Sequence, residues 1–274
     1  MRLDCHQHFW EYDPKKQDWI SPEMNRIRRN FRAADLYPLL QDAKMDGCIA
    51  VQADESLRET DFLLDLADQH EWILGVVGWV DLKSDSLDEI LDQYSEKAKL
   101  VGFREVLQSR DPQYMLQDTF IRGIHKIGER GYPYDILIFP NHLQASLDLV
   151  KKCPNQRFVI DHLAKPSIKD GEWKDWKKAI APLAERELVY CKLSGMITEA
   201  DWNTWTPAQL VPYLEIALDL FGPSRLMYGS DWPVCLLAGE YERFWGVIEE
   251  FTDSLSASEK ARIMGETAAE FYKI

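Results

Sequence analysis

The sequence predicts an α/β protein that forms one (β/α)8 barrel, a TIM barrel, with one extra helix at its C-terminal end. Three observations predict this fold. Short apolar segments alternate with longer amphipathic segments along nearly all of the 274 residues. The apolar segments are continuous, which is typical of strands that are covered on both faces. Eight such strand-then-helix units occur in about 250 residues, the usual length of a closed parallel barrel.

The expected elements follow one another in a regular order. The expected strands are residues 3–5, 48–52, 73–80, 100–106, 134–139, 158–160, 188–193 and 225–228. The expected helices are residues 33–45, 55–70, 84–98, 120–130, 142–151, 173–184, 207–220 and 240–251, and the extra helix is 257–272. No GxGxxG or GxxxxGK[ST] loop follows a strand, so the nucleotide-binding open sheets lose support. The chain shows no linker or internal repeat, and we therefore expect a single domain over residues 1–274.

Composition excludes several classes of partner. The formal net charge of −14 argues against nucleic acid, which binds to basic surfaces. No apolar stretch reaches the ~20 residues that a membrane-spanning helix needs. Asp4, His6 and Glu11 interrupt the region where a signal peptide would be apolar, so we expect a cytoplasmic protein. The five cysteines are scattered without a CxxC pair, which fits a reducing compartment.

The first expected strand ends in His6-Gln7-His8. Alternate side chains of a strand point to the same side, so His6 and His8 converge on one point. Two imidazoles in this arrangement can share a metal ion or hold one substrate. The alternative is a surface turn, but two of only six histidines are used here.

Polar residues recur at the other strand ends, where the chemistry of such barrels takes place. In chain order they are Gln52; Trp79 and Asp81; Arg104 and Glu105; Asp135; Asp161, His162 and Lys165; Lys192 and Ser194; and Ser230, Asp231 and Trp232. Each residue alone has a simpler explanation, such as a helix cap or a solvated rim. Together at one face of the barrel, they indicate a ligand-binding or catalytic site.

Five segments carry a resemblance to a known family. They are DCHQHFW (4–10), VGFR (101–104), VIDHLAKP (159–166), KLSG (192–195) and YGSDWP (228–233). In these segments the chain resembles the amidohydrolase superfamily, and most closely its lactonase-like branch. That branch includes L-fucono- and L-rhamnono-lactonases and relatives of 2-pyrone-4,6-dicarboxylate lactonase. The segments span nearly the whole chain, so the resemblance is specific for the family but not for the substrate.

The resemblance implies hydrolysis of a sugar-acid lactone, with Asp231 and His162 as catalytic residues. Lactone opening needs an activated water, stabilisation of the oxyanion and a proton for the leaving alkoxide. In the superfamily the strand-eight aspartate takes the proton of the water and delivers it to the leaving group. Asp231 matches that position.

The resemblance also implies a site for a divalent metal ion. His6, His8, His162 and Asp231 are the candidate ligands, and imidazole and carboxylate suit Zn²⁺ or Mn²⁺. Strand five is a departure from the family, because many members place a histidine or a carboxylated lysine there. This chain has Asp135 in the strand and His142 beyond it. A metal-independent enzyme, in which the histidines and cations stabilise the oxyanion, therefore stays open.

The expected substrate-binding residues are Trp10, Gln52, Arg104, Lys165, Lys192 and Trp232. Arginine offers a planar fork for carboxylates and lysine a point charge, whereas the indoles offer an apolar wall for a sugar ring. Glu105 departs from the family, since relatives often have histidine after this arginine. Neighbours on a strand point to opposite sides, so Arg104 and Glu105 cannot both enter a regular barrel.

Two other functions remain as alternatives. One is a metal-dependent decarboxylase or another amidohydrolase that acts on a small carboxylate, and the other is a binding barrel without catalysis. A non-catalytic barrel would lack the base, whereas His6, His8, His162 and Asp231 are all present. The expected partner is a small-molecule lactone, and the oligomeric state is left open, with a homodimer as one option.

Overall fold

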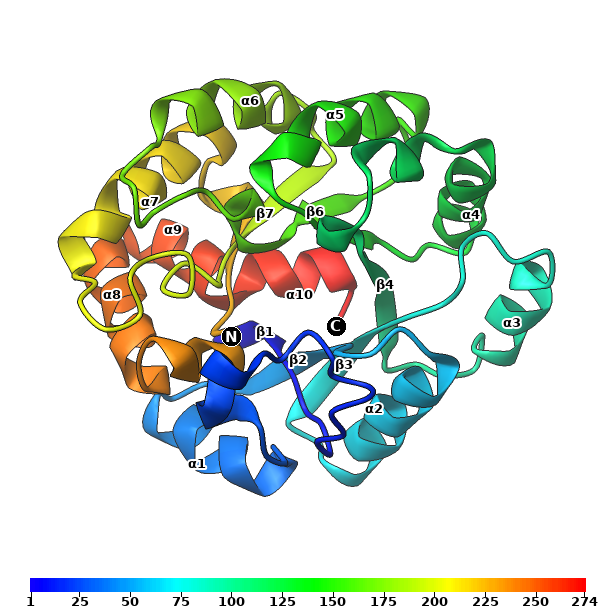
Figure 1. Ribbon diagram of the computed structural model, residues 1–274, viewed down its shortest axis with the longest axis horizontal. Helices are drawn as coiled ribbons and strands as arrows, with labels where there is room; N and C mark the ends of the chain where they lie inside the picture. The colour runs from blue at the N-terminus through cyan, green and yellow to red at the C-terminus, as the bar shows by residue number, and fades with distance from the viewer.

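The computed structural model describes residues 1–274 and contains eight parallel strands that follow one another around a barrel (Figure 1). They are β1 (Leu3–Gln7), β2 (Gly47–Val51), β3 (Ile73–Gly78), β4 (Leu100–Val106), β5 (Tyr134–Leu137), β6 (Phe158–Ile160), β7 (Val189–Leu193) and β8 (Leu226–Tyr228). The ring closes where the N–H of Asp231 donates to the carbonyl of His6 at 2.8 Å and that of His8 donates to Trp232 at 2.7 Å. The predicted (β/α)8 barrel is confirmed.

Most of the ten helices surround the ring of strands, whereas the last of them lies across it (Figure 1). They are α1 (Ala33–Asp42), α2 (Leu57–Gln69), α3 (Leu87–Gln93), α4 (Asp118–Glu129), α5 (Leu143–Lys152), α6 (Lys174–Ala184), α7 (Pro207–Phe221), α8 (Tyr241–Thr252), α9 (Ala257–Ala261) and α10 (Thr267–Tyr272). α3 is shorter than the predicted 84–98. The hydroxyl of Ser84 accepts the N–H of Ser86 at 3.2 Å, and such a bond favours a turn over a helix. The predicted helix 257–272 is divided by a π-helical turn at Arg262–Glu266.

Side chains on the strands alternate between two apolar clusters. Outward residues such as Cys48 and Ala50 pack against the helices, whereas inward residues such as Ile49 and Val51 meet inside the barrel. The inner cluster consists of Leu3, Cys5, Ile49, Val51, Val77, Val101, Val159, Met227, Ala268, Phe271 and Tyr272. Its last three residues belong to α10, which lies across the middle of the ring in Figure 1. The extra helix therefore fills one end of the barrel.

A register shift in β1 between Asp4 and Gln7 breaks the simple alternation. Cys5 belongs to the inner apolar cluster, yet the next residue, His6, also points inward and contacts Lys192. Gln7 points outward, where its amide donates to the sulfur of Cys48 at 3.2 Å. An extra residue of this kind re-aims side chains near active sites. The convergence predicted for the two histidines is confirmed, and the shift adds Cys5 to the same side.

Asp4 links the first strand to the last. Its buried carboxylate accepts the N–H of Ser230 at 2.8 Å and that of His6 at 3.2 Å, and it accepts the hydroxyl of Tyr241 at 3.2 Å. Burial raises the pKa of Asp4 to about 6, against the lowering effect of these hydrogen bonds. One side chain thus joins β1, the segment after β8 and α8 at the closure of the barrel.

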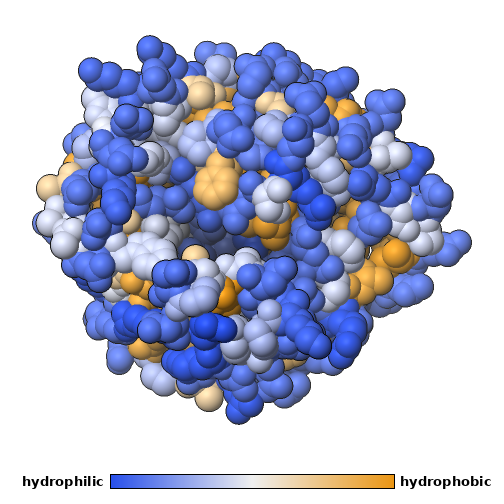
Figure 2. Space-filling model, in the orientation of Figure 1, coloured by the Kyte–Doolittle hydropathy of each residue, from blue (hydrophilic) through white to orange (hydrophobic).

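The face of the molecule seen in Figure 2 is mainly hydrophilic and is hollowed near its centre. None of the helices combines the length and apolar character that crossing a bilayer requires. The five cysteines are free and buried.

Candidate active site

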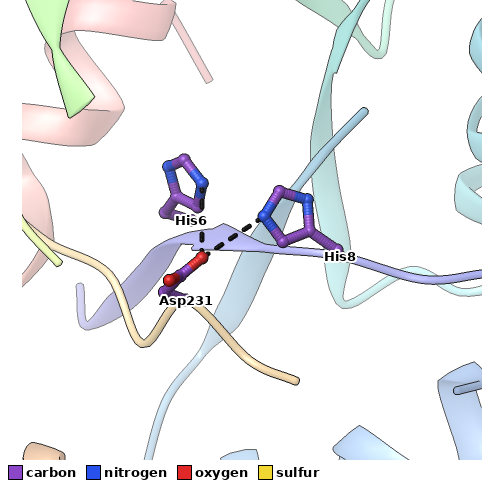
Figure 3. Close-up of side chains that lie close together, drawn as sticks. All are labelled: His6, His8 and Asp231. Carbon is purple, nitrogen blue, oxygen red and sulfur yellow. Dashed lines mark ion pairs between the residues drawn. The ribbon is translucent and has the colours of Figure 1, made fainter. Parts of the chain in front are cut away.

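Three imidazoles surround one carboxylate oxygen. Oδ1 of Asp231 lies 3.4 Å from Nε2 of His8 and 3.8 Å from Nε2 of both His6 and His162. Figure 3 shows His6, on β1, and His8, directly after it, both directed at Asp231, which comes from the segment after β8. Each of the four side chains belongs to a residue that is at most 5% exposed. The four residues predicted as catalytic or metal-binding therefore meet at one point.

The other ring nitrogens of His8 and His162 are held by the barrel. Nδ1 of His8 lies 2.7 Å from the carbonyl oxygen of Val51, which can only accept a hydrogen bond. In its neutral form His8 therefore carries its proton on Nδ1 and turns a lone pair toward Asp231. Nδ1 of His162 lies 2.9 Å from the hydroxyl of Ser194. A nitrogen lone pair and a carboxylate oxygen repel each other. The contact between His8 and Asp231 becomes favourable when a proton or a metal cation lies between the two atoms.

His6 lies between two cations. Its Nε2 is 3.2 Å from the guanidinium of Arg104, and its Nδ1 is 3.1 Å from Nζ of Lys192. Burial, assisted by Lys192, lowers the pKa of His6 well below its usual value, although Asp161 opposes this. Burial also lowers the pKa of His162 to about 4, against the effect of Asp231. Both rings are therefore neutral at pH 7.

Asp161 was among the polar residues expected at the strand ends, but it had no predicted catalytic, binding or metal role, yet it lies at the centre of the charged cluster. Its carboxylate is 3.0 Å from Nζ of Lys192 and 3.1 Å from Arg104. Burial alone would raise its pKa, but Lys192 and His6 hold the pKa of Asp161 well below its usual range. An Asp-His pair at a strand end was the available signal. It was equally consistent with a helix cap.

The four residues His162 to Lys165 all adopt left-handed backbone angles, with φ between 52° and 57°. This conformation costs ~1–2 kcal/mol for each residue other than glycine, and such strain is concentrated at functional sites. The indole of Trp176 donates to the carbonyl of Leu163 at 2.7 Å and holds the turn. A side chain at Gly195 would place its Cβ 2.5 Å from Nδ1 of His162. Glycine is therefore required beside this ring.

Asp231 also has a left-handed backbone, with φ of 58°. Burial alone would raise its pKa, but attraction to the neighbouring histidines, first of all to His162, which gains its charge in acid, outweighs burial, so the pKa of Asp231 lies below its usual range. The group is consequently ionised at neutral pH, which is the state that a general base needs.

The predicted substrate-binding residues separate into two groups. Gln52, Arg104 and Lys192 are buried, and most of their polar atoms contact other protein groups: the side-chain amide of Gln52 donates to the backbone carbonyl of Arg104 at 3.1 Å, and the Arg104 guanidinium donates to the backbone carbonyl of Gln52. Oε1 of Gln52 and Nε of Arg104 have no hydrogen-bond partner. Lys165 lies at the rim, where its side chain is 18% exposed and its Nζ is 3.7 Å from Glu199. Only Lys165 presents a cation that is partly accessible.

The two tryptophans lie in apolar packing. Trp10 is 1% exposed, and its indole donates to the carbonyl of Arg29 at 2.8 Å. Trp232 is 2% exposed and packs edge-on against Phe9 and Phe31. The rings form the packed wall behind the site, and direct stacking of a substrate on them stays a prediction.

Three polar residues whose roles were left open now have positions. Asp135 points inward and pairs with Lys192 at 2.6 Å. Glu105 points outward, where it accepts the hydroxyl of Tyr114 at 2.6 Å, as alternation along β4 requires when Arg104 points inward. His142 contacts the carbonyl of Arg110 at 2.9 Å and lies outside the histidine cluster.

Comparison with known proteins identifies the family. The model of the amidohydrolase family matches residues 3–274. The chain belongs to the amidohydrolase family. This amidohydrolase is 38% identical to an L-fucono-1,5-lactonase of Burkholderia multivorans, with 100% of this chain and 96% of the relative covered. It is 35% identical to an L-fucono-1,5-lactonase of Burkholderia ambifaria, with the same coverage. A crystal structure of a Burkholderia multivorans amidohydrolase with bound zinc has a TM-score of 0.97 and 37% identity, covering 100% of this chain and 99% of that chain.

The amidohydrolase has a donor set that fits a small divalent cation. The donor atoms of His6, His8 and Asp231 all lie within 4.8 Å of one another. Two ligands of a tetrahedral zinc ion, each about 2.0 Å from the metal, are about 3.3 Å apart. The 3.4 Å between His8 and Asp231 is close to that spacing. His6, Asp161 and His162 form a second group with the same limit of separation.

Proposed function

We propose that this amidohydrolase opens a sugar-acid lactone of the L-fucono-1,5-lactone type to the free acid. The single observation that carries the proposal is an ionised Asp231 that faces three imidazoles within 3.8 Å. The two lactonases that are 35–38% identical over the full chain support the substrate class. They do not favour the decarboxylase alternative.

Asp231 is the proposed general base. A water beside its carboxylate loses a proton to Oδ1 as the water oxygen attacks the lactone carbonyl, which gives a tetrahedral oxyanion. The ring C–O bond then breaks, and the proton on Asp231 passes to the leaving alkoxide oxygen. The products are a hydroxyl group and a carboxylic acid, which releases its remaining proton to the solvent, and Asp231 is ionised again.

A metal would be held by His6, His8, His162 and Asp231. Such an ion, with zinc or manganese as the predicted metals, would polarise the carbonyl or acidify the attacking water. Without it, the proposed oxyanion stabilisers are the histidine rings and the neighbouring cations. Lys165 is the cation best exposed to a bound substrate.

Phe139 is the proposed contact for the apolar face of the sugar. It follows β5, it is 38% exposed, and Nζ of Lys165 lies 5.5 Å from its ring centroid. An aromatic ring beside a cation suits a polyhydroxylated ligand that has one apolar face. Phe139 thus offers the exposed surface that the buried Trp10 and Trp232 do not.

The direct test replaces Asp231 by asparagine and follows hydrolysis of L-fucono-1,5-lactone with a pH indicator, corrected for uncatalysed opening. We expect Asp231→Asn to lower kcat by at least about 10²-fold, because the base is lost. The matched control is Asp175→Asn, since Asp175 is an aspartate on the outer helix α6 whose side chain is 98% exposed. Its activity should remain within about twofold. Loss of less than tenfold in Asp231→Asn would exclude Asp231 as the base.

Metal dependence has its own test. The purified protein is treated with a chelator, its zinc and manganese contents are measured, and activity is assayed on lactones and on aromatic carboxylates. Release of carbon dioxide from the carboxylates without lactone hydrolysis would establish the decarboxylase.

The free, buried cysteines support the proposed cytoplasmic location. Light scattering would decide whether a homodimer forms.

A further inference from the structure

A chain of buried polar contacts connects α10 to the candidate active site. The hydroxyl of Tyr272 donates to Oδ2 of Asp135 at 2.7 Å. Nζ of Lys192 donates to the same oxygen at 2.6 Å and lies 3.1 Å from Nδ1 of His6. All four side chains are buried. A residue of the extra helix is therefore two side chains away from a ring that faces Asp231.

Lys192 is committed to this chain rather than to a substrate. An ammonium has three donors. Nζ donates to Asp135, lies 3.1 Å from Nδ1 of His6 and forms an ion pair with Oδ1 of Asp161, which has no hydrogen-bond partner. Nζ also lies 5.6 Å from the ring centroid of Tyr272. The residue is 0% exposed, so its influence on a reaction must pass through its neighbours.

Asp135 is held through one oxygen only. Oδ2 accepts both Tyr272 and Lys192, whereas Oδ1 has no hydrogen-bond partner. Loss of the tyrosine hydroxyl would leave Lys192 as the one group that orients this carboxylate, and the ammonium would gain freedom to move with it.

The position of the Lys192 ammonium matters because Nδ1 of His6 has one neighbour that donates hydrogen bonds and one that accepts them. Lys192 can only donate to Nδ1, whereas Asp161, whose Oδ1 is 3.3 Å away, can only accept from it. If Nδ1 accepts from Lys192, a neutral ring carries its proton on Nε2. If Nδ1 donates to Asp161, Nε2 is free to accept from Arg104 or to bind a cation.

We propose that Tyr272 is a positioning residue that acts through Asp135 and Lys192 to fix the orientation and the tautomer of His6. The kinetic part of this inference rests on the proposed lactonase function. α10 then has a role besides filling the barrel, because it sets the geometry of a ring at the far side of the ionic cluster.

The test compares Tyr272→Phe with Phe271→Leu. Both positions belong to α10 and to the inner apolar cluster, but only Tyr272 has a hydroxyl in the polar chain. We expect Tyr272→Phe to lower kcat about three- to tenfold with KM within twofold, the size expected from the net contribution of one ordinary hydrogen bond. Phe271→Leu should lower Tm and leave kcat within twofold. An unchanged kcat in a folded Tyr272→Phe protein would overturn the proposal.

A second readout does not depend on turnover. The ring ¹⁵N signals of His6, assigned with a His6→Gln sample, should shift in Tyr272→Phe and stay in place in Phe271→Leu. Unmoved signals would also overturn the proposal. If the wild-type protein shows no lactonase activity, the proposed function fails, whereas this measurement still decides the positioning role.

Asp135→Asn keeps the test available if Tyr272→Phe does not fold. Asparagine preserves the size of the side chain and removes its charge, so kcat should fall with KM unchanged. With both variants folded, their combined effect should be smaller than the product of the single effects, because both interrupt one chain of contacts. Independent effects that multiply would contradict the proposed chain.

Discussion

The two ends of the barrel interior differ sharply, although the same strands build both. β4 contributes Val101 to the apolar end and Arg104 to the charged end. The apolar end is completed by α10, whereas the charged end is completed by loops that carry His162 and Asp231. One continuous sheet therefore carries an apolar end that stabilises the fold and, a few residues further along the same strands, a charged end whose burial costs free energy.

Stability alone explains the apolar end. Burying an apolar side chain contributes about 1.5–3 kcal/mol. Buried ion pairs contribute little, because the desolvation of the charges offsets their attraction. The close contacts of Asp161 with Lys192 and Arg104 therefore indicate a functional requirement.

The largest effect on stability should follow from breaking the charged end. Lys192→Met removes the cation that pairs with Asp135 and Asp161 and leaves both carboxylates inside the barrel. We expect a loss of about 3–5 kcal/mol in the free energy of unfolding, measured by urea denaturation. A variant as stable as the wild type would show that these charges are not energetically coupled.

The apolar end should respond differently. Met227→Ala opens space in the inner cluster, where the side chain is fully buried. The expected loss is about 2–5 kcal/mol of unfolding free energy, with kcat of the folded protein within about twofold of wild type. A fall in kcat beyond tenfold would show that the base of the barrel and the site are not separable.

Glu59 is a buried carboxylate outside the barrel, and it can be compared with the paired carboxylates of the charged end. It has no ion-pair partner and accepts only the N–H of Ala53, at 3.0 Å. Burial raises its pKa to about 7 from 4.5, so the folded protein favours the neutral form and loses stability as pH rises through this interval. Glu59→Gln should therefore raise stability by about 1–3 kcal/mol at pH 8 and change it little at pH 5. Thermal unfolding at the two pH values measures this, and equal gains at both would contradict the raised pKa.

The smallest effect is expected at the rim. Phe139→Ala should raise KM for the lactone about three- to tenfold, since an aromatic contact of about 1 kcal/mol is lost. Stability should change little, because the side chain is 38% exposed. Phe139→Leu is the conservative control, and an unchanged KM in the alanine variant would remove Phe139 from the substrate site.

The sequence predicted the fold because strand and helix periodicities are local properties. It also predicted the meeting of His6, His8, His162 and Asp231, because strand ends of a parallel barrel share one face. Which charged residues of the site are buried and which are exposed depends on the packing of distant segments, so the local sequence does not predict it. Lys192 and Lys165 both follow apolar segments, yet one is enclosed and the other reaches the rim.

Tyr272 illustrates the same limit. It is the last residue of the predicted helix 257–272, where the sequence pattern does not distinguish it, and only the docking of α10 places its hydroxyl on Asp135. The register shift in β1 is likewise absent from the polarity pattern, because both Cys5 and His6 could be assigned to either face.

The contact of Asp4 with Ser230 has a consequence for the order in which the molecule assembles. These residues are 226 positions apart, so during synthesis the carboxylate lacks Ser230 and Tyr241, its two distant partners, until almost the whole barrel has left the ribosome. Contacts between residues so far apart in the sequence form late, because the chain loses entropy when the long loop closes and gains stabilising contacts only afterwards. Asp231 follows Ser230 directly. Recovery of activity after refolding should thus report the last event, the joining of the first strand to the last.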